Sequence, residues 1–247
     1  MKNEMIYEGK AKRLYTTDNA GVLLLEFKDS LTAFNAQKRG SFAGKGSINR
    51  DVAAHIFKEL KKKGIESHFL REVGEREMEV RRVRIIPLEV VVRNVLAGST
   101  AKKMGRDEGE PLPRPLVEFY YKDDALADPF LSDDQAIVLG IATAEQIAIL
   151  KQKALEINQV LQGLFQAVGI QLIDFKVEFG TPSESEGDIV LADEITPDCC
   201  RLWDAKSGER LDKDRFRRDL GRVEESYSEV LKRLTNSSGH RFVPGGR

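Results

Sequence analysis

The clearest alternation of hydrophobic and polar residues along the chain lies in "LIDFKVEFG", residues 172–180. From residue 173 onward, apolar side chains take the odd positions, and Asp174, Lys176 and Glu178 take the even ones. A period of two is typical of a β-strand with two different faces, and the bulky apolar residues predict a central strand. The charged face has two interpretations. It is either an ordinary solvated face of an antiparallel sheet or part of a functional site.

The first third of the chain reads mainly as β-structure with one helix. "MIYEGKAKRLY" at 5–15 predicts strand, glycine turn and strand, and "GVLLLEF" at 21–27 predicts a further strand. A helix is predicted from about 48 to 63, with Ser47 as its cap and Gly64 at its end. Two more short strands are expected, at 65–71 and 76–84.

A second region opens at Pro87 with the strand "LEVVVRN", which is followed by a short lysine-rich helix after Gly98 and Ser99. Residues 105–135 are expected to be irregular, because they contain "EPLPRP" and the acidic "KDDALADPFLSDD". An irregular segment of this length is usually functional or disordered.

The C-terminal half predicts two helices around a hairpin. Thr143 and Gln146 form a capping box for a helix that reaches about residue 168. "TPSESEG" links the strand at 172–180 to "DIVLADE" at 188–194, which makes a hairpin. Asp212 is predicted to cap one last helix, and the tail at 235–247 is expected to be loose. The buried side of that helix carries Phe216, Leu220, Val223, Tyr227, Val230 and Leu234.

The predicted hairpin gathers like charges. Its second strand brings Asp193 and Glu194 beside Asp174, Lys176 and Glu178, so four acids share a small region with one lysine. Such a cluster costs free energy unless a cation neutralises it. Carboxylates without histidine or cysteine suit Mg²⁺, which commonly takes one or two of them together with phosphate oxygens. The pairing register is not readable from the sequence, so it stays open which acids converge.

Two further elements suit anions. Gly9 allows a tight turn, and Lys10 and Lys12 lie on one face beside it, which suits phosphate groups, although the spacing is not that of a Walker loop. A glycine hairpin with exposed lysines is the alternative. Arg93 ends a buried strand, and Ser99 stands at a helix start, where free amides favour an anion. A simple cap with a structural ion pair is the alternative there.

Length and composition exclude several classes of protein. The chain has 247 residues, of which 41% are hydrophobic and 32% charged, as in an ordinary globular protein of one or two domains. A net charge of −1 argues against nucleic acid as the main partner. The chain has no run of about 18 apolar residues, and "MKNEMIYEGK" lacks the apolar stretch of a secretion signal. We therefore expect a cytoplasmic protein with no membrane partner.

Neither cysteine nor histidine chemistry is favoured. Cys199 and Cys200 are adjacent and are the only cysteines, so we expect reduced thiols. The histidines at 55, 68 and 240 are scattered and form neither the spacing of a zinc site nor a Ser-His-Asp triad.

Two long segments resemble the signature sequences of the SAICAR synthetase family, where SAICAR is phosphoribosylaminoimidazole-succinocarboxamide. They are "IIPLEVVVRNVLAGS" at 85–99 and "LIDFKVEFG" at 172–180. Other segments are similar to the same family in the same order: "YEGKAKRLY", "KDDALADPF", "DEITPD" followed by "RLWD", and "DKDRFR". The resemblance runs from about residue 6 to 234. The cysteine pair departs from the small residues that are more usual at its position.

The resemblance implies an α+β fold of two domains. A small β-rich domain at 1–86 would resemble the N-lobe of kinases. A larger α+β domain at 87–247, related to ATP-grasp proteins, would carry the metal and ribonucleotide sites. ATP would lie in the cleft between them, beneath the turn at Gly9. The implied reaction uses ATP and Mg²⁺ to condense L-aspartate with the carboxylate of carboxyaminoimidazole ribonucleotide (CAIR), and it yields SAICAR, ADP and phosphate.

The resemblance also implies roles for individual residues. Lys176 and Asp174 would be catalytic and face the reacting carboxylate. Phosphoryl transfer to a carboxylate needs mainly positioning and neutralised charge, which a lysine flanked by metal-binding acids supplies. The other implied roles are ATP binding by Gly9, Lys10, Ala11, Lys12, Glu178 and Asp193, metal binding by Glu178 and Asp193, and binding of the other substrates by Arg93, Ser99, Arg201, Lys122 and Asp128.

Two other functions share part of these features. A kinase-type phosphotransferase would use the same glycine turn, lysines and acids, but neither an HRD-like nor a DFG string occurs in the chain. A nucleotide-sensing module would keep Lys12 without needing a second anion site at Arg93, Ser99 and Arg201. We expect a homodimer, because two-fold dimers are the commonest soluble oligomers.

Overall fold

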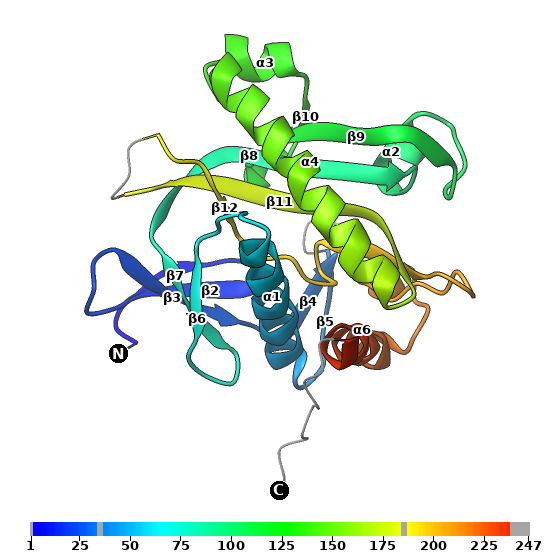
Figure 1. The fold of residues 1–247 in the computed structure, drawn as a ribbon, viewed down its shortest axis with the longest axis horizontal. Coiled ribbons are helices and arrows are strands. Elements are labelled where there is room, and N and C mark those ends of the chain that lie inside the picture. Colours follow the sequence, from blue (N-terminus) through cyan, green and yellow to red (C-terminus); the bar gives the residue numbers. More distant parts are fainter. Residues whose placement is uncertain (1, 34–36, 184–186, 238–247) are drawn as a thin grey trace, which may run out of the picture.

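The computed structural model describes residues 2–33, 37–183 and 187–237. They form a mixed α+β fold on two main antiparallel sheets, which confirms the α+β class (Figure 1). The two sheets are joined where Ser67 forms a parallel bridge with Leu191 and the His68 N–H donates to the Leu191 carbonyl (2.7 Å).

The N-terminal part of the chain supplies β1 (Met5–Glu8), β2 (Lys12–Thr16), β3 (Val22–Phe27), β4 (Ser30–Ala33), β5 (Lys38–Ser41), α1 (Lys45–Lys62), β6 (Phe69–Glu72) and β7 (Glu77–Arg81). Five of these strands form the first sheet in the order β1-β2-β3-β7-β6, and α1 packs against it (Figure 1). The strands predicted around the glycine turn and at 21–27 are confirmed. The hairpin of β4 and β5 is an element that the sequence analysis missed.

Helix α1 begins at Lys45, earlier than predicted. Its N-cap residue is Gly44, which has a left-handed backbone (φ 84°). The Ser47 hydroxyl donates back to the Gly44 carbonyl (2.9 Å), so Ser47 lies inside the helix and does not cap it. Glycine reaches this backbone conformation without a steric penalty, and its position therefore determines where the helix starts. The predicted end is confirmed, with Gly64 also left-handed (φ 79°).

The rest of the chain supplies β8 (Val83–Val95), α2 (Gly98–Lys103), β9 (Pro111–Tyr121), the 3-10 turn η1 (Asp124–Leu126), β10 (Phe130–Leu131), α3 (Asp133–Val138), α4 (Ala144–Ala167), β11 (Ile170–Pro182), β12 (Val190–Ala192), β13 (Cys200–Asp204), α5 (Asp214–Arg217) and α6 (Val223–Ser237). The second sheet has the order β10-β9-β8-β11-β12, and β13 also pairs with β11. Helix α4 lies across this sheet, and α6 lies beside α1 (Figure 1). The predicted capping box of Thr143 and Gln146 starts α4.

Residues 105–135, expected to be irregular, contain the long strand β9. Its prolines at 111, 113 and 115 lie outside the part that pairs with β10, where β9 forms the edge of the sheet. Proline cannot donate the N–H that an inner strand needs, but an edge strand tolerates it. The prediction of an irregular segment was wrong because the cost of the missing proline N–H depends on whether a second strand pairs with β9 at that point.

Strand β8 runs through the domain boundary predicted between residues 86 and 87. The register between β8 and β11 shifts near Pro87, since Glu178 pairs with Glu89 and Gly180 pairs with Ile85. A bulge of this kind accommodates a proline. One continuous strand therefore links the two regions, and the division into 1–86 and 87–247 stays a prediction.

Strand β11 is central, as its alternation predicted. β8 pairs along one edge, and β12 and β13 pair along the other. The predicted hairpin is confirmed, with Glu178 opposite Ala192. Two of the three charged residues on its charged face are buried, Asp174 at 3% exposure and Glu178 at 4%, whereas the Lys176 side chain is 32% exposed, so this is not an ordinary solvated face.

The alternation breaks near the start of β11. Leu172 packs in the main core, whereas its neighbour Ile173 packs in a separate cluster with Val95 and Ala97. The register between β11 and β13 shifts between Leu172 and Asp174, and this irregularity places Ile173 outside the main core.

The last helix, predicted as a single element, is two helices, α5 and α6. Asp212 accepts the N–H of Asp214 (2.7 Å) at the start of α5, close to its predicted role. Leu220, expected to be buried, is exposed. A left-handed backbone, which a right-handed helix cannot contain, interrupts the segment at Asp219 (φ 55°), Gly221 (φ 66°) and Arg222 (φ 51°).

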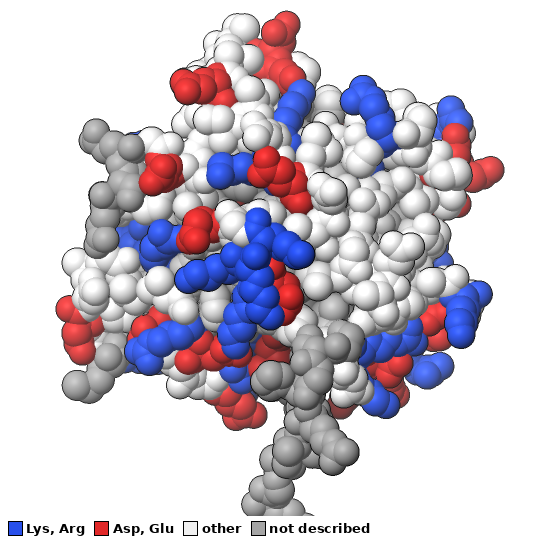
Figure 2. Space-filling model, viewed as in Figure 1, with Lys and Arg blue, Asp and Glu red and all other residues white. Residues whose placement is uncertain are grey.

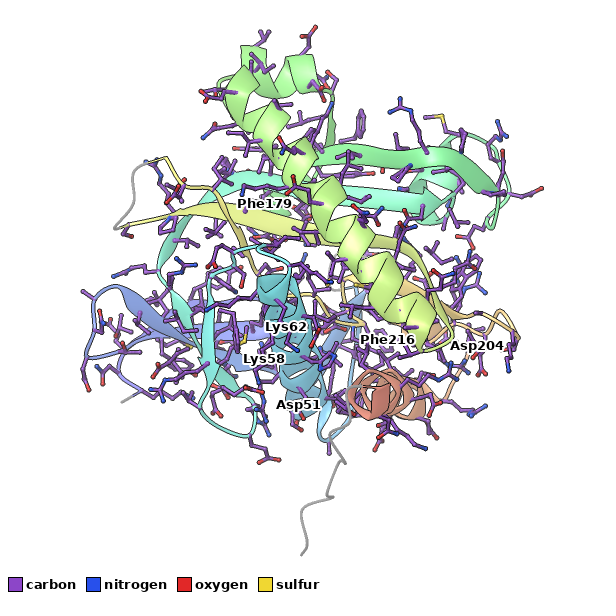
Figure 3. All side chains as sticks on the ribbon, in the orientation of Figure 1. Asp51, Lys58, Lys62, Phe179, Asp204 and Phe216 are labelled. Atoms are coloured by element: carbon purple, nitrogen blue, oxygen red, sulfur yellow. The ribbon has the colours of Figure 1, made fainter. Side chains whose placement is uncertain are left out.

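The charged side chains on the face shown in Figure 2 gather over α1, whereas the surface over the C-terminal half of α4 is mostly uncharged. Lys58 and Lys62 extend from α1 on this face (Figure 3). Of the tail predicted to be loose, residues 235–237 end α6, and the remainder lies outside the described residues. Within the described ranges, no helix is both long enough and apolar enough to cross a membrane.

Candidate active site

The segment 193–199 crosses the middle of β11, on the edge that β12 and β13 share. β12 pairs with β11 near Glu178, and β13 pairs with the earlier part of β11, up to Phe175. Between these two ladders the Lys176 N–H donates to the Cys199 carbonyl (2.9 Å). Asp193 starts the segment with a left-handed backbone (φ 64°), which ends the ladder of β12 and turns the chain.

The glycine turn of the first sheet reaches this segment. The Lys12 ammonium contacts the Asp193 carboxylate and lies 2.9 Å from Glu194 Oε1. The turn is closed by the Gly9 N–H, which donates to the Lys12 carbonyl (2.8 Å). Burial opposes the charge of this ammonium, but the two carboxylates outweigh that effect and raise the pKa of Lys12. Lys12 therefore stays protonated and links the two sheets.

The segment "KDDALADPF" forms a compact turn next to the glycine turn. Lys10 Nζ lies 2.8 Å from Asp124 Oδ1 in η1. The Asp123 side chain accepts backbone N–H groups of η1 and caps it. Asp128, predicted to bind substrate, accepts the Asp123 N–H through Oδ1 (3.1 Å) and so closes the turn.

Lys122 and Lys176 hold the buried carboxylate of Glu178. Lys122 Nζ lies 2.7 Å from Glu178 Oε1, and Lys176 Nζ lies 3.9 Å from the same oxygen. Lys176 makes its closer contact with Glu89 on β8. Burial disfavours its charge, but Glu89 and Glu178 prevail and raise the pKa of Lys176. Lys176 is thus a protonated ammonium held by acids from two adjacent strands.

Glu178 is buried and Asp193 is half-buried, and the two carboxylates repel each other. Burial, followed by the charge of Asp193, raises the pKa of Glu178. Burial also opposes ionisation of Asp193, but Lys12 and then Lys176 lower the pKa of that carboxyl to about 2. Among the residues that the structure describes, no three or more His, Cys, Asp or Glu side chains group as metal ligands. Mg²⁺ commonly takes one or two protein carboxylates and completes its ligands with phosphate oxygens and water. The pair of Glu178 and Asp193 therefore fits a Mg²⁺ ion that binds together with a nucleotide.

A second charged layer lies at the other end of the charged face, around Asp174. Arg93 contacts Asp174 Oδ2, and its Nε lies 2.7 Å from Glu118 Oε2. Arg201 Nη1 lies 2.8 Å from the same Asp174 oxygen, and its Nε lies 2.9 Å from Asp214. Burial opposes both guanidinium charges, but the carboxylates raise the pKa of each arginine. Asp174 therefore holds two arginines side by side, an arrangement suited to a doubly charged anion.

Gly98, the first residue of α2, lies directly against Arg201. Its backbone is left-handed (φ 63°), and an added Cβ would lie 2.5 Å from Arg201 Nη2. Any larger residue would displace the guanidinium. The N-cap residue of α2 is Ala97, and Ser99 is exposed in the first turn, so the simple cap was wrong, whereas the structural ion pair of Arg93 that belonged to the same interpretation is present.

A model of the SAICAR synthetase family matches residues 5–234 of the chain. The chain belongs to this family. The phosphoribosylaminoimidazole-succinocarboxamide synthase of Listeria innocua is 55% identical over 234 residues, which are 95% of this chain and 98% of that protein. The enzyme of the same name from Halalkalibacterium halodurans is 52% identical over 94% of this chain and 98% of its own length.

Solved structures of SAICAR synthetases share the fold. The Ehrlichia chaffeensis enzyme superposes with a TM-score of 0.92 at 44% identity, over 94% of this chain and 98% of that one. A SAICAR synthetase in complex with ADP gives a TM-score of 0.90 at 46% identity, with the same coverage. The family that the sequence resemblance indicated, and the ATP-driven condensation of CAIR with L-aspartate that it implied, are confirmed.

In this member of the SAICAR synthetase family, the structure brings some of the predicted site residues into contact with one another and leaves others apart. Direct contacts join Lys12 to Asp193 and Arg93 and Arg201 to Asp174, whereas Ser99 stands exposed. Sequence reasoning missed the partners Glu89, Glu118 and Asp214. A signal for the first was present, because Glu89 and Arg93 alternate on one face of β8 just as the charged residues alternate on β11.

Proposed function

We propose that ATP binds between the glycine turn of the first sheet and the charged face of β11. Lys10 and Lys12 contact its phosphates, the backbone at Gly9 and Ala11 approaches them, and Glu178 and Asp193 hold Mg²⁺. Bound Mg²⁺ neutralises charge on the transferred phosphoryl group. The observation that carries this proposal is the contact of Lys12 with Asp193 and Glu194, since it brings the phosphate-binding turn against the metal-binding acids.

The reaction is the ATP-driven condensation of CAIR with L-aspartate, which yields SAICAR, ADP and phosphate. Arg93, Arg201 and Ser99 bind the phosphate of CAIR, because the paired guanidinium groups are already held side by side by Asp174. Lys176 faces the carboxylate that reacts, and Asp174 positions the arginines at the same face. Lys122 and Asp128 complete the substrate side from the 122–128 turn.

The two sheets then correspond to two lobes. The first resembles a kinase N-lobe and the second an ATP-grasp domain, with the division near residues 86 and 87 inside β8 and the nucleotide between them.

The free thiols of Cys199 and Cys200 suit the reducing cytoplasm in which we expect the enzyme to work. Its homodimeric state remains a prediction, which light scattering of the purified protein measures.

Turnover is expected to require CAIR and L-aspartate together. Phosphate release is measured with ATP and Mg²⁺, with each substrate omitted in turn and with L-glutamate in place of L-aspartate. A ligase releases phosphate only with both substrates. Equal ADP formation with water or L-glutamate would indicate a phosphotransferase or ATPase, and nucleotide binding without any turnover would indicate a sensing module.

The two anion sites are expected to respond separately to mutation. Arg201→Ala should weaken CAIR binding by about 1.5–3 kcal/mol, the worth of a charge-assisted contact, and leave ATP binding unchanged. Lys12→Ala should have the opposite selectivity. Arg201 is the better choice than Arg93, because removal of the buried Arg93 would take the paired guanidinium away from the buried Glu118 and destabilise the fold, although Asp174 would keep Arg201. Calorimetric titration of each variant with each ligand is the measurement, and a swapped pattern would reject the assignment.

A further inference from the structure

Lys213 carries a half-buried ammonium group that lacks a hydrogen bond within the described part of the chain. Its side chain is only 13% exposed. The carboxylate oxygen within ion-pair range, Asp198 Oδ1, lies 3.9 Å away, which is too far for a hydrogen bond. The backbone N–H of Lys213 donates to the Pro197 carbonyl (3.1 Å), so the residue is fixed against the 193–199 segment.

Asp198 does not satisfy Lys213, because stronger partners already use both of its oxygens. Lys45 contacts Oδ2, and Asn49 Nδ2 donates to the same oxygen (2.9 Å). The Tyr227 hydroxyl donates to Oδ1 (2.8 Å). A buried ammonium is costly unless it is paired and hydrogen-bonded, and burial lowers the pKa of Lys213 accordingly. Its donors are thus available for a ligand.

The surroundings of Lys213 indicate which ligand. On one side it faces the 193–199 segment, where Glu194 contacts Lys12 of the ATP site. The next residue in the chain is Asp214, which holds Arg201 of the CAIR phosphate site (2.9 Å). The phosphates of both nucleotides already have their cations in the proposed function. The remaining anionic substrate is the dicarboxylate amino acid.

We propose that Lys213 donates to a carboxylate of L-aspartate and forms part of the acceptor site. The inference rests on the proposed function, because it assigns the third substrate of that reaction to a lysine whose neighbours belong to the other two sites. An ammonium has three donors and no fixed plane, so it can meet a carboxylate and keep its weak contact with Asp198.

The test is the steady-state kinetics of Lys213→Met. The KM for L-aspartate is expected to rise at least about tenfold, as for the loss of one charge-assisted contact, while the KM values for ATP and CAIR stay within about twofold. Succinate, which has both carboxylates and no amine, is expected to inhibit the parent enzyme competitively against L-aspartate and to inhibit the variant about tenfold more weakly.

Tyr227→Phe is the matched control, since it removes a hydrogen bond to the same Asp198 oxygen that lies near Lys213. It should leave the KM for L-aspartate unchanged. An unchanged KM in Lys213→Met would overturn the subsite, as would equal rises for all three substrates or the same rise in Tyr227→Phe. If the parent enzyme shows no turnover that depends on L-aspartate, the proposed reaction itself fails, and the subsite fails with it.

Discussion

Replacing Lys176 by methionine is expected to lower kcat by about 10²-fold or more while ATP and CAIR still bind, as for the loss of one charge contact in the transition state. The structure supports this expectation, because Lys176 is a protonated ammonium held by Glu89 and lying 3.9 Å from Glu178. Glu178 is buried and the side chain of Glu89 is only 13% exposed, so both acids are largely shielded from water. The measurement is kcat together with the affinity of each nucleotide.

Two further variants make the test specific. Lys176→Arg should rescue poorly, because a planar guanidinium cannot replace a compact ammonium between two acids. Glu89→Gln removes the closer partner of Lys176 and should lower kcat less than Lys176→Met, since the ammonium itself remains. A near-normal kcat in Lys176→Met would show that the lysine only neutralises the acids of this face. The substitution would then behave like an ordinary surface change, which alters stability by no more than about 0.5 kcal/mol.

Glu178→Gln and Asp193→Asn are each expected to abolish most activity while the protein stays folded. Both acids are assigned to the same Mg²⁺, so the double variant should lose little more than either single one. Asparagine is the better choice at Asp193 because it tolerates the left-handed backbone found there (φ 64°) better than most residues. The measurements are kcat, the Mg²⁺ concentration that gives half-maximal rate, and the melting temperature of each variant.

The same pair makes a prediction about protonation. The charge of Asp193 helps to raise the pKa of Glu178, so Asp193→Asn should lower the pKa of Glu178. Titration of Glu178 by carbon-13 NMR in the parent and the variant measures this shift. A double variant whose loss equals the product of the two single losses would contradict the shared ion, and an unchanged pKa would contradict the close approach of the two carboxylates.

Local patterns in the sequence predicted those features that depend on near neighbours. The alternation at 172–180, the hairpin to Asp193 and the capping box at Thr143 all follow from periods and spacings within a few residues. The two signature segments carried the family and with it the ligase class, because long unusual strings are specific regardless of how the chain folds. These predictions needed no knowledge of which segments meet in space.

The tertiary structure alone decided what depends on distant partners. Lys12 and Asp193 meet although they are 181 residues apart, and Lys176 turns to Glu89 on a neighbouring strand rather than to an acid of its own. The prolines of β9 are tolerated because that part of the strand lies at a sheet edge. Strand order and register set each of these contacts, and they arise from the packing of the whole chain. The sequence by itself could therefore identify the charged residues of the site, while only the fold determined which acidic side chain pairs with which basic one.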